Sequence, residues 1–184
     1  MTTDTILWRR LDTPGHDACR VEQGAEGWRL QGVANFRHES GPAYLAYEVD
    51  CDAGWVTREG LVHGWVGALS VDLWVKRTPD GAWTLNDQVV PGLDGCLDLD
   101  LGFTPATNLA QLRRVALRVG QAADVPVAWL DVPAGTLDRL HQRYERRSAE
   151  LYWYEAPRFG YSAFLRVNAV GFAVEYPELW EAEP

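Results

Sequence analysis

Two aspartates in one short run carry the clearest potential chemistry in this sequence. In DLDLGF, alternation places Asp98 and Asp100 on one face of a strand and the leucines on the other. The two carboxylates are then separated by about 6.6 Å of strand rise. Inverting glycosidases use carboxylates at a similar separation, but theirs flank the scissile bond from opposite sides. Neighbours on one strand approach from the same side, so the pair favours a structural or binding role over acid–base catalysis.

The arginines that follow offer simpler partners for these carboxylates. In LRRVALRVG, the alternation predicts a strand with Arg114 and Arg118 on one face. If that strand pairs with the aspartate strand across the TPATN bend, the two arginines neutralise Asp98 and Asp100 in a charge ladder. Arg113 shares a face with aliphatic residues, so its guanidinium needs a buried carboxylate, or a sugar or phosphate head group in a wet cavity. We therefore expect a strand and bend, held by arginines, at the rim of a cavity.

Motifs for catalysis or metal binding are missing from the sequence. The four histidines are dispersed, with no H-x-H or H-x-x-x-H pair to seed a transition-metal site. The sequence has no G-x-S-x-G elbow, no Walker sequence and no G-x-G-x-x-G motif. A calcium site would need more oxygen ligands than the two aspartates provide. We expect no catalytic residue, no metal and no cofactor, and the sequence gives no support to an enzyme.

The aromatic residues suggest a binding site of another kind. Nine Trp, seven Tyr and five Phe are more large rings than a chain of 184 residues needs for packing alone. Four of these rings, Trp28, Phe36, Trp65 and Trp74, could grip an acyl chain or stack on a sugar. Core and surface packing is the alternative role. Trp28 and Phe36, which share one strand face, are the better candidates.

A period of two dominates the chain and predicts the elements that position these residues. In GWRLQGVANFR, Trp28, Leu30 and Phe36 share one face of a half-buried strand. In GWVGALSVDLWVKR, alternation places Asp72 and Trp74 on the same strand face, and the polar residues on that face predict that it is the more solvent-exposed one. Turn sequences separate such runs, and TPDG predicts a hairpin because Pro fixes the first torsion and Asp-Gly tolerates positive φ. The fold class is therefore all-β with little helix, an antiparallel meander curled into a β-roll or open barrel.

The length and the remaining segments agree with this fold class. The chain fits one β-roll domain over residues 1–184, because single cores extend to about 250 residues. TLDRLHQRYERR and LYWYE favour a hairpin turning near Arg147 and Ser148 over a helix. A short helical turn is expected in NLAQL, capped by Thr107 or Asn108.

Composition limits the partners and the compartment. A net charge of −9 argues against nucleic acid and anionic membrane surfaces, which both require clustered Lys and Arg. Three cysteines without a C-x-x-C pair favour reduced thiols. The sequence has no apolar run long enough for a transmembrane span or a signal peptide. We expect a cytoplasmic protein.

The sequence resembles a bacterial family, the putative glycolipid-binding proteins. The resemblance rests on DGCLDLDLGFTPATNLAQLRRVALRVG, on QRY with LYWYE, and on the closing VGFAVEYPELWEAEP. It implies a spiral β-roll, similar in shape to the open-barrel carriers that move lipoproteins and glycolipids between bacterial membranes, although those carriers have export signals. The signature residues of the resemblance are Asp98, Asp100, Thr104, Pro105, Thr107, Asn108, Arg113, Tyr176 and Pro177. In VGFAVEYP, Gly171 is expected to supply a hairpin turn and Pro177 to end a strand.

Three classes of function remain open at this point. The first is a non-enzymatic protein that holds a glycolipid or another amphiphile in the concave interior, with Trp28, Phe36, Trp65, Trp74, Asp98, Asp100 and Arg113 as the candidate ligand-binding residues. The second is a hydrolase or transferase acting on a sugar or lipid conjugate, with Asp98, Asp100 and Glu175 as the available acids. The third is a scaffold or oligomerisation domain that uses exposed tryptophans as a contact patch.

Overall fold

The computed structural model describes residues 2–184, which form one continuous sheet of 15 strands with two short helical segments. In chain order the elements are β1 (Thr3–Arg10), β2 (Gly15–Gln23), β3 (Gly27–His38), β4 (Gly41–Asp52), β5 (Thr57–Val66), β6 (Leu69–Arg77), β7 (Trp83–Leu85), β8 (Gln88–Val90), β9 (Asp98–Leu101), α1 (Asn108–Val115), β10 (Ala122–Asp131), β11 (Thr136–Arg146), β12 (Leu151–Ala156), the 3-10 turn η1 (Pro157–Phe159), β13 (Tyr161–Val167), β14 (Ala173–Tyr176) and β15 (Trp180–Ala182).

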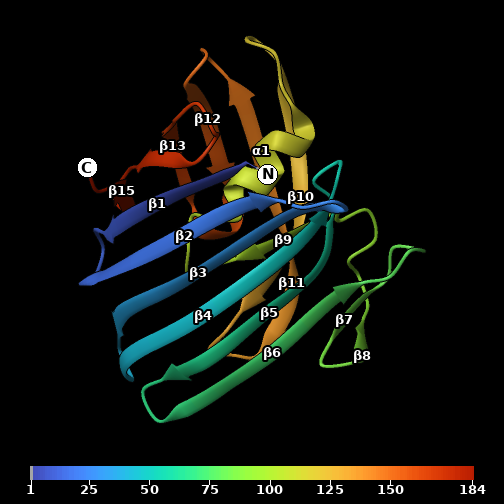
Figure 1. Cartoon of the computed structure of the whole chain (residues 1–184), viewed down its shortest axis with the longest axis vertical. Coiled ribbons are helices and arrows are strands. Elements are labelled where there is room, and N and C mark those ends of the chain that lie inside the picture. The colour runs from blue at the N-terminus through green and yellow to red at the C-terminus, as the bar shows by residue number, and fades with distance from the viewer. Residues whose placement is uncertain (1) are drawn as a thin grey trace.

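The sheet is two meanders joined at the chain ends. Strands β1 to β8 neighbour one another in sequence order, β15 back to β9 do the same, and β1 pairs with β15. All neighbours are antiparallel except β9 and β10, which are parallel. The front strands β1–β6 and the back strands β10–β13 form two layers of the curl (Figure 1). The expected all-β, mainly antiparallel open roll is therefore confirmed.

The far edge of the sheet curls back toward its middle. Beside β9, the amide of Thr57 at the start of β5 donates to the carbonyl of Leu97 at 2.9 Å. The Leu99 amide donates to the Thr57 hydroxyl at 3.0 Å. Because β9 and β5 are far apart in sheet order, these contacts hold the curl without a ladder that would close it into a barrel.

Helix α1 lies inside this curl and corrects one expectation. The predicted strand in LRRVALRVG is wrong: its first part belongs to α1, which ends where Ala116 takes a left-handed conformation with φ 45°. The helical turn expected at NLAQL is confirmed, but its Thr107 cap is not, since that hydroxyl accepts from the Leu101 amide at 3.2 Å. The helix is favoured over a strand here because it buries its first five residues between β9, β11 and the β13–β14 turn.

The local turn expectations are confirmed. TPDG lies between β6 and β7, and β11 and β12 form the hairpin that turns at 147–150. Gly171 turns the chain before β14 with φ 105°, and β14 ends at the residue before Pro177. Each of these turns depends on residues within the turn itself, which is why sequence alone indicates them.

The interior of the roll is a continuous apolar core. Its largest fully buried side chains include Trp8, Trp83, Tyr144 and Phe172. All three cysteines are free and buried, and burial raises the pKa of each thiol, which disfavours the reactive thiolate form. Within residues 2–184, neither helical segment is long and apolar enough to span a bilayer.

Candidate functional site

The two aspartates of β9 face α1. Strand alternation puts Asp98 and Asp100 on one side of β9, and helical spacing puts Gln111 and Arg114 on the matching side of α1. Two strand residues span about 6.6 Å and three helical residues about 4.5 Å, so each aspartate meets one helix residue. All four residues of the DLDL strand are buried. The sequence located the shared face correctly, but a helix covers it where an arginine-bearing strand was expected.

Both carboxylate oxygens of Asp98 are bound in an ion pair with Arg114 of the helix. Arg114 Nε lies 2.9 and 3.0 Å from the two carboxylate oxygens, and Nη2 lies 2.6 Å from Oδ2. Burial raises the pKa of Asp98, and the Arg114 guanidinium opposes that shift. The predicted cross-strand ladder is thus wrong in its geometry: Arg114 reaches Asp98 from a helix, and Arg118 is exposed. Asp98 has a structural partner and does not line the interior pocket.

Asp100 has amide partners in place of a cation. Its Oδ2 accepts from Gln142 Nε2 at 2.8 Å and from Gln111 Nε2 at 3.1 Å. The network continues through Tyr144, whose hydroxyl donates to Gln111 Oε1 at 2.6 Å and accepts from Asn108 Nδ2 at 2.7 Å. Burial raises the pKa of Asp100, and the two amide hydrogen bonds oppose that rise. The result is a hydrogen-bonded polar floor with one carboxyl group in it.

This floor underlies a pocket of about 370 Å³, which we call the central pocket. Its polar lining is Asp100, Thr104, Asn108 and Gln142. Its aromatic lining, drawn from β10 and from the segments between β12 and β15, is Trp129, Tyr154, Phe159, Tyr161, Tyr176 and Trp180. The rings contact one another: Tyr176 lies 5.7 Å from Tyr154 and 5.6 Å from Tyr161 between ring centroids. A polar floor under aromatic walls is typical of a pocket that orients a ligand by a few hydrogen bonds.

A second, mostly apolar pocket of about 150 Å³ adjoins the first, and we call it the annex. The two share Gly102 and Trp129 in their linings. Most of the annex lining is apolar and comes from strand ends and loops: Phe36, Leu45, Val66, Phe103, Leu130 and Val132, beside Arg10, His38 and Asp131. At Gly102, a Cβ atom would lie 2.4 Å from Trp129 Nε1. The missing side chain therefore lets the Trp129 ring occupy the boundary between the two pockets.

A buried acid lies behind the central pocket. Asp17 on β2 is 0% exposed, and Tyr47 donates to its carboxylate oxygens at 3.1 and 3.2 Å. Thr104, which lines the pocket, also donates to Asp17, and its oxygen accepts from the Ala106 amide at 3.0 Å. Burial raises the pKa of Asp17 to about 6 against these donors. Gly32 makes room for the group, since a Cβ there would lie 2.3 Å from the Tyr47 hydroxyl.

The predicted aromatic residues are spread over the roll. Trp28 lines a polar groove at the end of the roll near the β2–β3 turn and stacks on Trp55 at 4.3 Å. Phe36 lines the annex at the other end of the same strand, under the guanidinium of Arg10 at 4.6 Å. Eight residues of strand separate Trp28 from Phe36, about 26 Å, so one small ligand cannot contact both. Of this pair, Phe36 belongs to the connected pockets.

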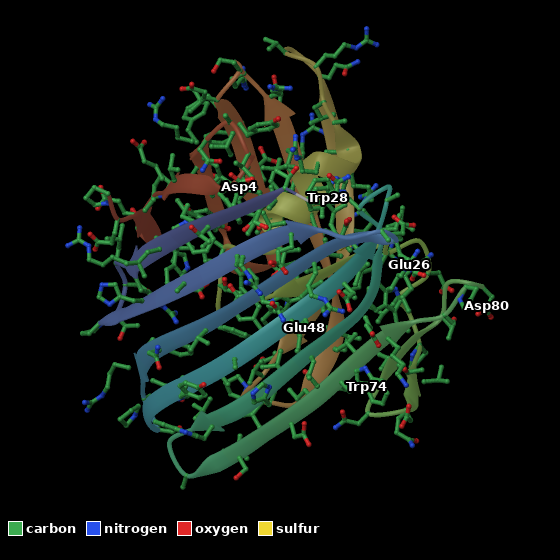
Figure 2. All side chains as sticks on the ribbon, in the orientation of Figure 1. Asp4, Glu26, Trp28, Glu48, Trp74 and Asp80 are labelled. Carbon is green, nitrogen blue, oxygen red and sulfur yellow. The ribbon has the colours of Figure 1, made fainter. Side chains whose placement is uncertain are left out.

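Trp65 and Trp74 lie on the outer face of the sheet. Trp65 is 44% exposed and stacks on Tyr44, and Trp74 is 40% exposed. Figure 2 shows Trp74 on the same outer face as Glu48. The prediction that Trp74 lies on the more solvent-exposed strand face is confirmed. Neither tryptophan lines the interior pockets.

Arg113 does not reach a buried carboxylate. It lies at the exposed side of α1, with its guanidinium 5.8 Å from the Trp55 ring. The helix explains this position, because Arg113 is one residue away from the Arg114 side that faces β9.

Comparison with known proteins supports the resemblance seen in the sequence. The family described as "Putative glycolipid-binding" matches residues 5–182. The chain belongs to this putative glycolipid-binding family. A crystal structure of a DUF1089 family protein from Pseudomonas aeruginosa is similar, with a TM-score of 0.78 and 26% identity over 98% of this chain and 92% of that chain. No curated protein matches the chain.

Some signature residues of the glycolipid-binding resemblance meet in the central pocket. Asp100, Thr104, Asn108 and Tyr176 line it, although they come from β9, the following loop, the start of α1 and β14. Sequence reasoning missed most of the aromatic wall. Alternation in LYWYE pairs Tyr152 with Tyr154 on a buried face, which was the available signal. Asp17 was also missed, although it shares strand parity with Cys19 and Val21.

Proposed function

We propose that this chain binds a glycolipid or a similar amphiphile, with the sugar head group in the central pocket and part of the apolar tail in the annex. One observation carries the proposal: a pocket with a polar floor and aromatic walls shares Gly102 and Trp129 with a pocket that is mostly apolar. An amphiphile has the same two parts in the same order. The family description points to the same class of ligand.

The size of the pockets fits a head group with a partly enclosed tail. Small-molecule pockets range over about 300–1,000 Å³, and the central pocket, at about 370 Å³, is at the low end. The annex, at about 150 Å³, holds a short piece of alkyl chain. The rest of a longer tail would lie against exposed apolar residues near the pockets, such as Phe159, which is 53% exposed.

The carboxylates favour binding over catalysis. Glycosidases of the common two-acid type place two carboxyl groups on either side of the scissile bond. Among the described residues that line the central pocket, Asp100 is the one carboxylic acid. Asp98 is held by Arg114, and Glu175 is exposed and pairs with Arg166 at 3.2 Å. The acids named for a hydrolase or transferase thus do not face each other across the pocket.

Blocking the boundary between the pockets tests the proposal. In Gly102→Ala, the new Cβ would displace the Trp129 ring, which lines both pockets. We expect n-octyl β-D-glucoside, titrated calorimetrically below its micelle concentration, to bind the unaltered protein and to bind the variant about tenfold more weakly, a loss of about 1.4 kcal/mol. Free glucose, which lacks a tail, should bind more weakly than the glucoside.

The control substitution is Gly24→Ala. Its Cβ would meet only the Gly27 carbonyl oxygen, at 3.9 Å, and the site is remote from both pockets. Gly24→Ala should therefore bind octyl glucoside like the unaltered protein. Equal loss of binding in both variants, or no binding of the glucoside to any of the three proteins, would rule out the two-pocket proposal.

A further inference from the structure

Several polar side chains present acceptor oxygens to the central pocket, beside the tyrosine hydroxyls and indole N–H groups of its aromatic wall. Within residues 2–184, both hydrogen bonds to the Asp100 carboxylate go to Oδ2, so Oδ1 is available to a ligand. Asn108 uses its Nδ2 on the Tyr144 hydroxyl, which leaves its carbonyl oxygen for the pocket. Two of the four polar residues in the lining thus present an oxygen that needs a donor.

Thr104 presents the same chemistry for a different reason. A hydroxyl has one hydrogen, and Thr104 donates that hydrogen to Asp17 behind the pocket wall. The oxygen of Thr104 can therefore only accept from a ligand. The buried acid Asp17 in this way fixes the hydrogen-bonding character of a residue that a ligand would touch.

Positive charge is missing from the central pocket. Its lining, in the part of the chain that the structure describes, contains no Lys, Arg or His. Two arginines lie near its tryptophans but are already paired. Arg10 lies 5.3 Å from the Trp180 ring and binds Asp12 at 2.6 and 3.0 Å. Arg158 lies 4.8 Å from the Trp129 ring and contacts Asp138 at 3.4 Å.

We infer that the head group this pocket accepts is uncharged and rich in hydroxyl donors, and that phosphate and carboxylate head groups are rejected. The inference rests on the proposed function and adds the chemical class of the ligand. A sugar hydroxyl gives Asp100 Oδ1 a charge-assisted hydrogen bond, which is among the stronger kinds. An anion in the same place would lose its hydration, find no cation and be repelled by Asp100.

Two amphiphiles with the same tail test this inference. We expect n-octyl β-D-glucoside to bind at least about tenfold more tightly than n-octyl phosphate, by calorimetry at pH 8.5, which favours the ionised Asp100 carboxyl. The variant Asp100→Asn should make this preference smaller, because the repelling charge is gone while the pocket lining still holds no cation. Its amide oxygen can still accept from Gln111 and Gln142 in place of Oδ2. Its NH₂ group then takes the position of Oδ1, so that a donor faces the pocket where the carboxylate presented an acceptor.

The matched control is Asp87→Asn, which removes the same charge from the exposed turn between β7 and β8. Asp87 has φ 62°, a conformation that Asn tolerates, so this variant should fold normally and keep the preference for the glucoside. Equal binding of the two amphiphiles, with both affinities reduced in Gly102→Ala, would overturn the head-group inference and leave the proposed function standing. A preference of unchanged size in Asp100→Asn would also overturn the inference. Binding of neither amphiphile would instead reject the proposed function itself.

Discussion

Replacing Arg114 by Met is expected to lower the free energy of unfolding by about 3–5 kcal/mol at pH 7. The Asp98 side chain is 0% exposed, and Arg114 makes three contacts of 2.6–3.0 Å with its carboxylate. Methionine keeps most of the volume of arginine but leaves a buried carboxylate without its cation. Urea unfolding followed by tryptophan fluorescence measures the loss, since nine tryptophans report on the fold.

The cause of this loss can be separated from lost packing. Lowering the pH to about 5 should shrink the penalty, because an unpaired buried Asp98 has its pKa raised further and takes up a proton. The control Arg143→Met removes a partly exposed arginine whose contact with Asp124 is 3.5 Å, and should cost under about 1 kcal/mol. A loss for Arg114→Met that matches the control, or that is the same at both pH values, would contradict the buried ion pair as its cause.

Asp17→Asn is expected to change the pH dependence of stability by about 2–3 kcal/mol between pH 4 and pH 7.5. Burial raises the pKa of Asp17 from about 3.8 to about 6. Between these two values the folded protein keeps a proton that the unfolded chain has lost, so the unaltered protein loses stability as the pH rises. Asparagine has no proton to lose and should remove this slope.

The hydrogen bonds around Asp17 allow the amide to fit. Tyr47 can still donate to the amide oxygen, and the Thr104 hydroxyl can rotate to accept from the amide NH₂ group. The measurement is the difference in unfolding free energy between the variant and the unaltered protein at several pH values, so that groups common to both cancel. This difference should grow in favour of Asp17→Asn as the pH rises from about 4 to about 6, and should level off above that. Parallel pH profiles for the two proteins would show that Asp17 titrates near its ordinary value.

Much of the fold follows from local pattern. Alternation identified β3 and the outward face of Trp74 on β6, and turn residues located the β6–β7 and β11–β12 hairpins. These features depend on neighbours in sequence, because side chains alternate along a strand and Pro, Asp and Gly set turn torsions locally. The placement of Asp98 and Asp100 on one strand face is a result of the same kind.

The helix shows where local pattern is insufficient. LRRVALRVG alternates well enough for a strand, yet its start forms the last turns of α1, with Leu112 buried and Arg114 directed at Asp98. Alternation and helical spacing coincide over so short a run, and burial against distant strands decides between them. Because this segment was expected to be a strand, an arginine was expected to partner Asp100. In the structure its partners are the two glutamines, Gln111 and Gln142.

The sequence by itself indicated several of the strands, the hairpin turns, the fold class and the shared face of the two aspartates. Only the tertiary structure decided that this face is covered by a helix, that Asp17 is buried behind Thr104, and that rings from β10 to β15 surround Asp100. The physical reason is that periodicity is a property of a few neighbouring residues. The environment of a polar side chain depends instead on which distant segment the curl of the sheet brings over it.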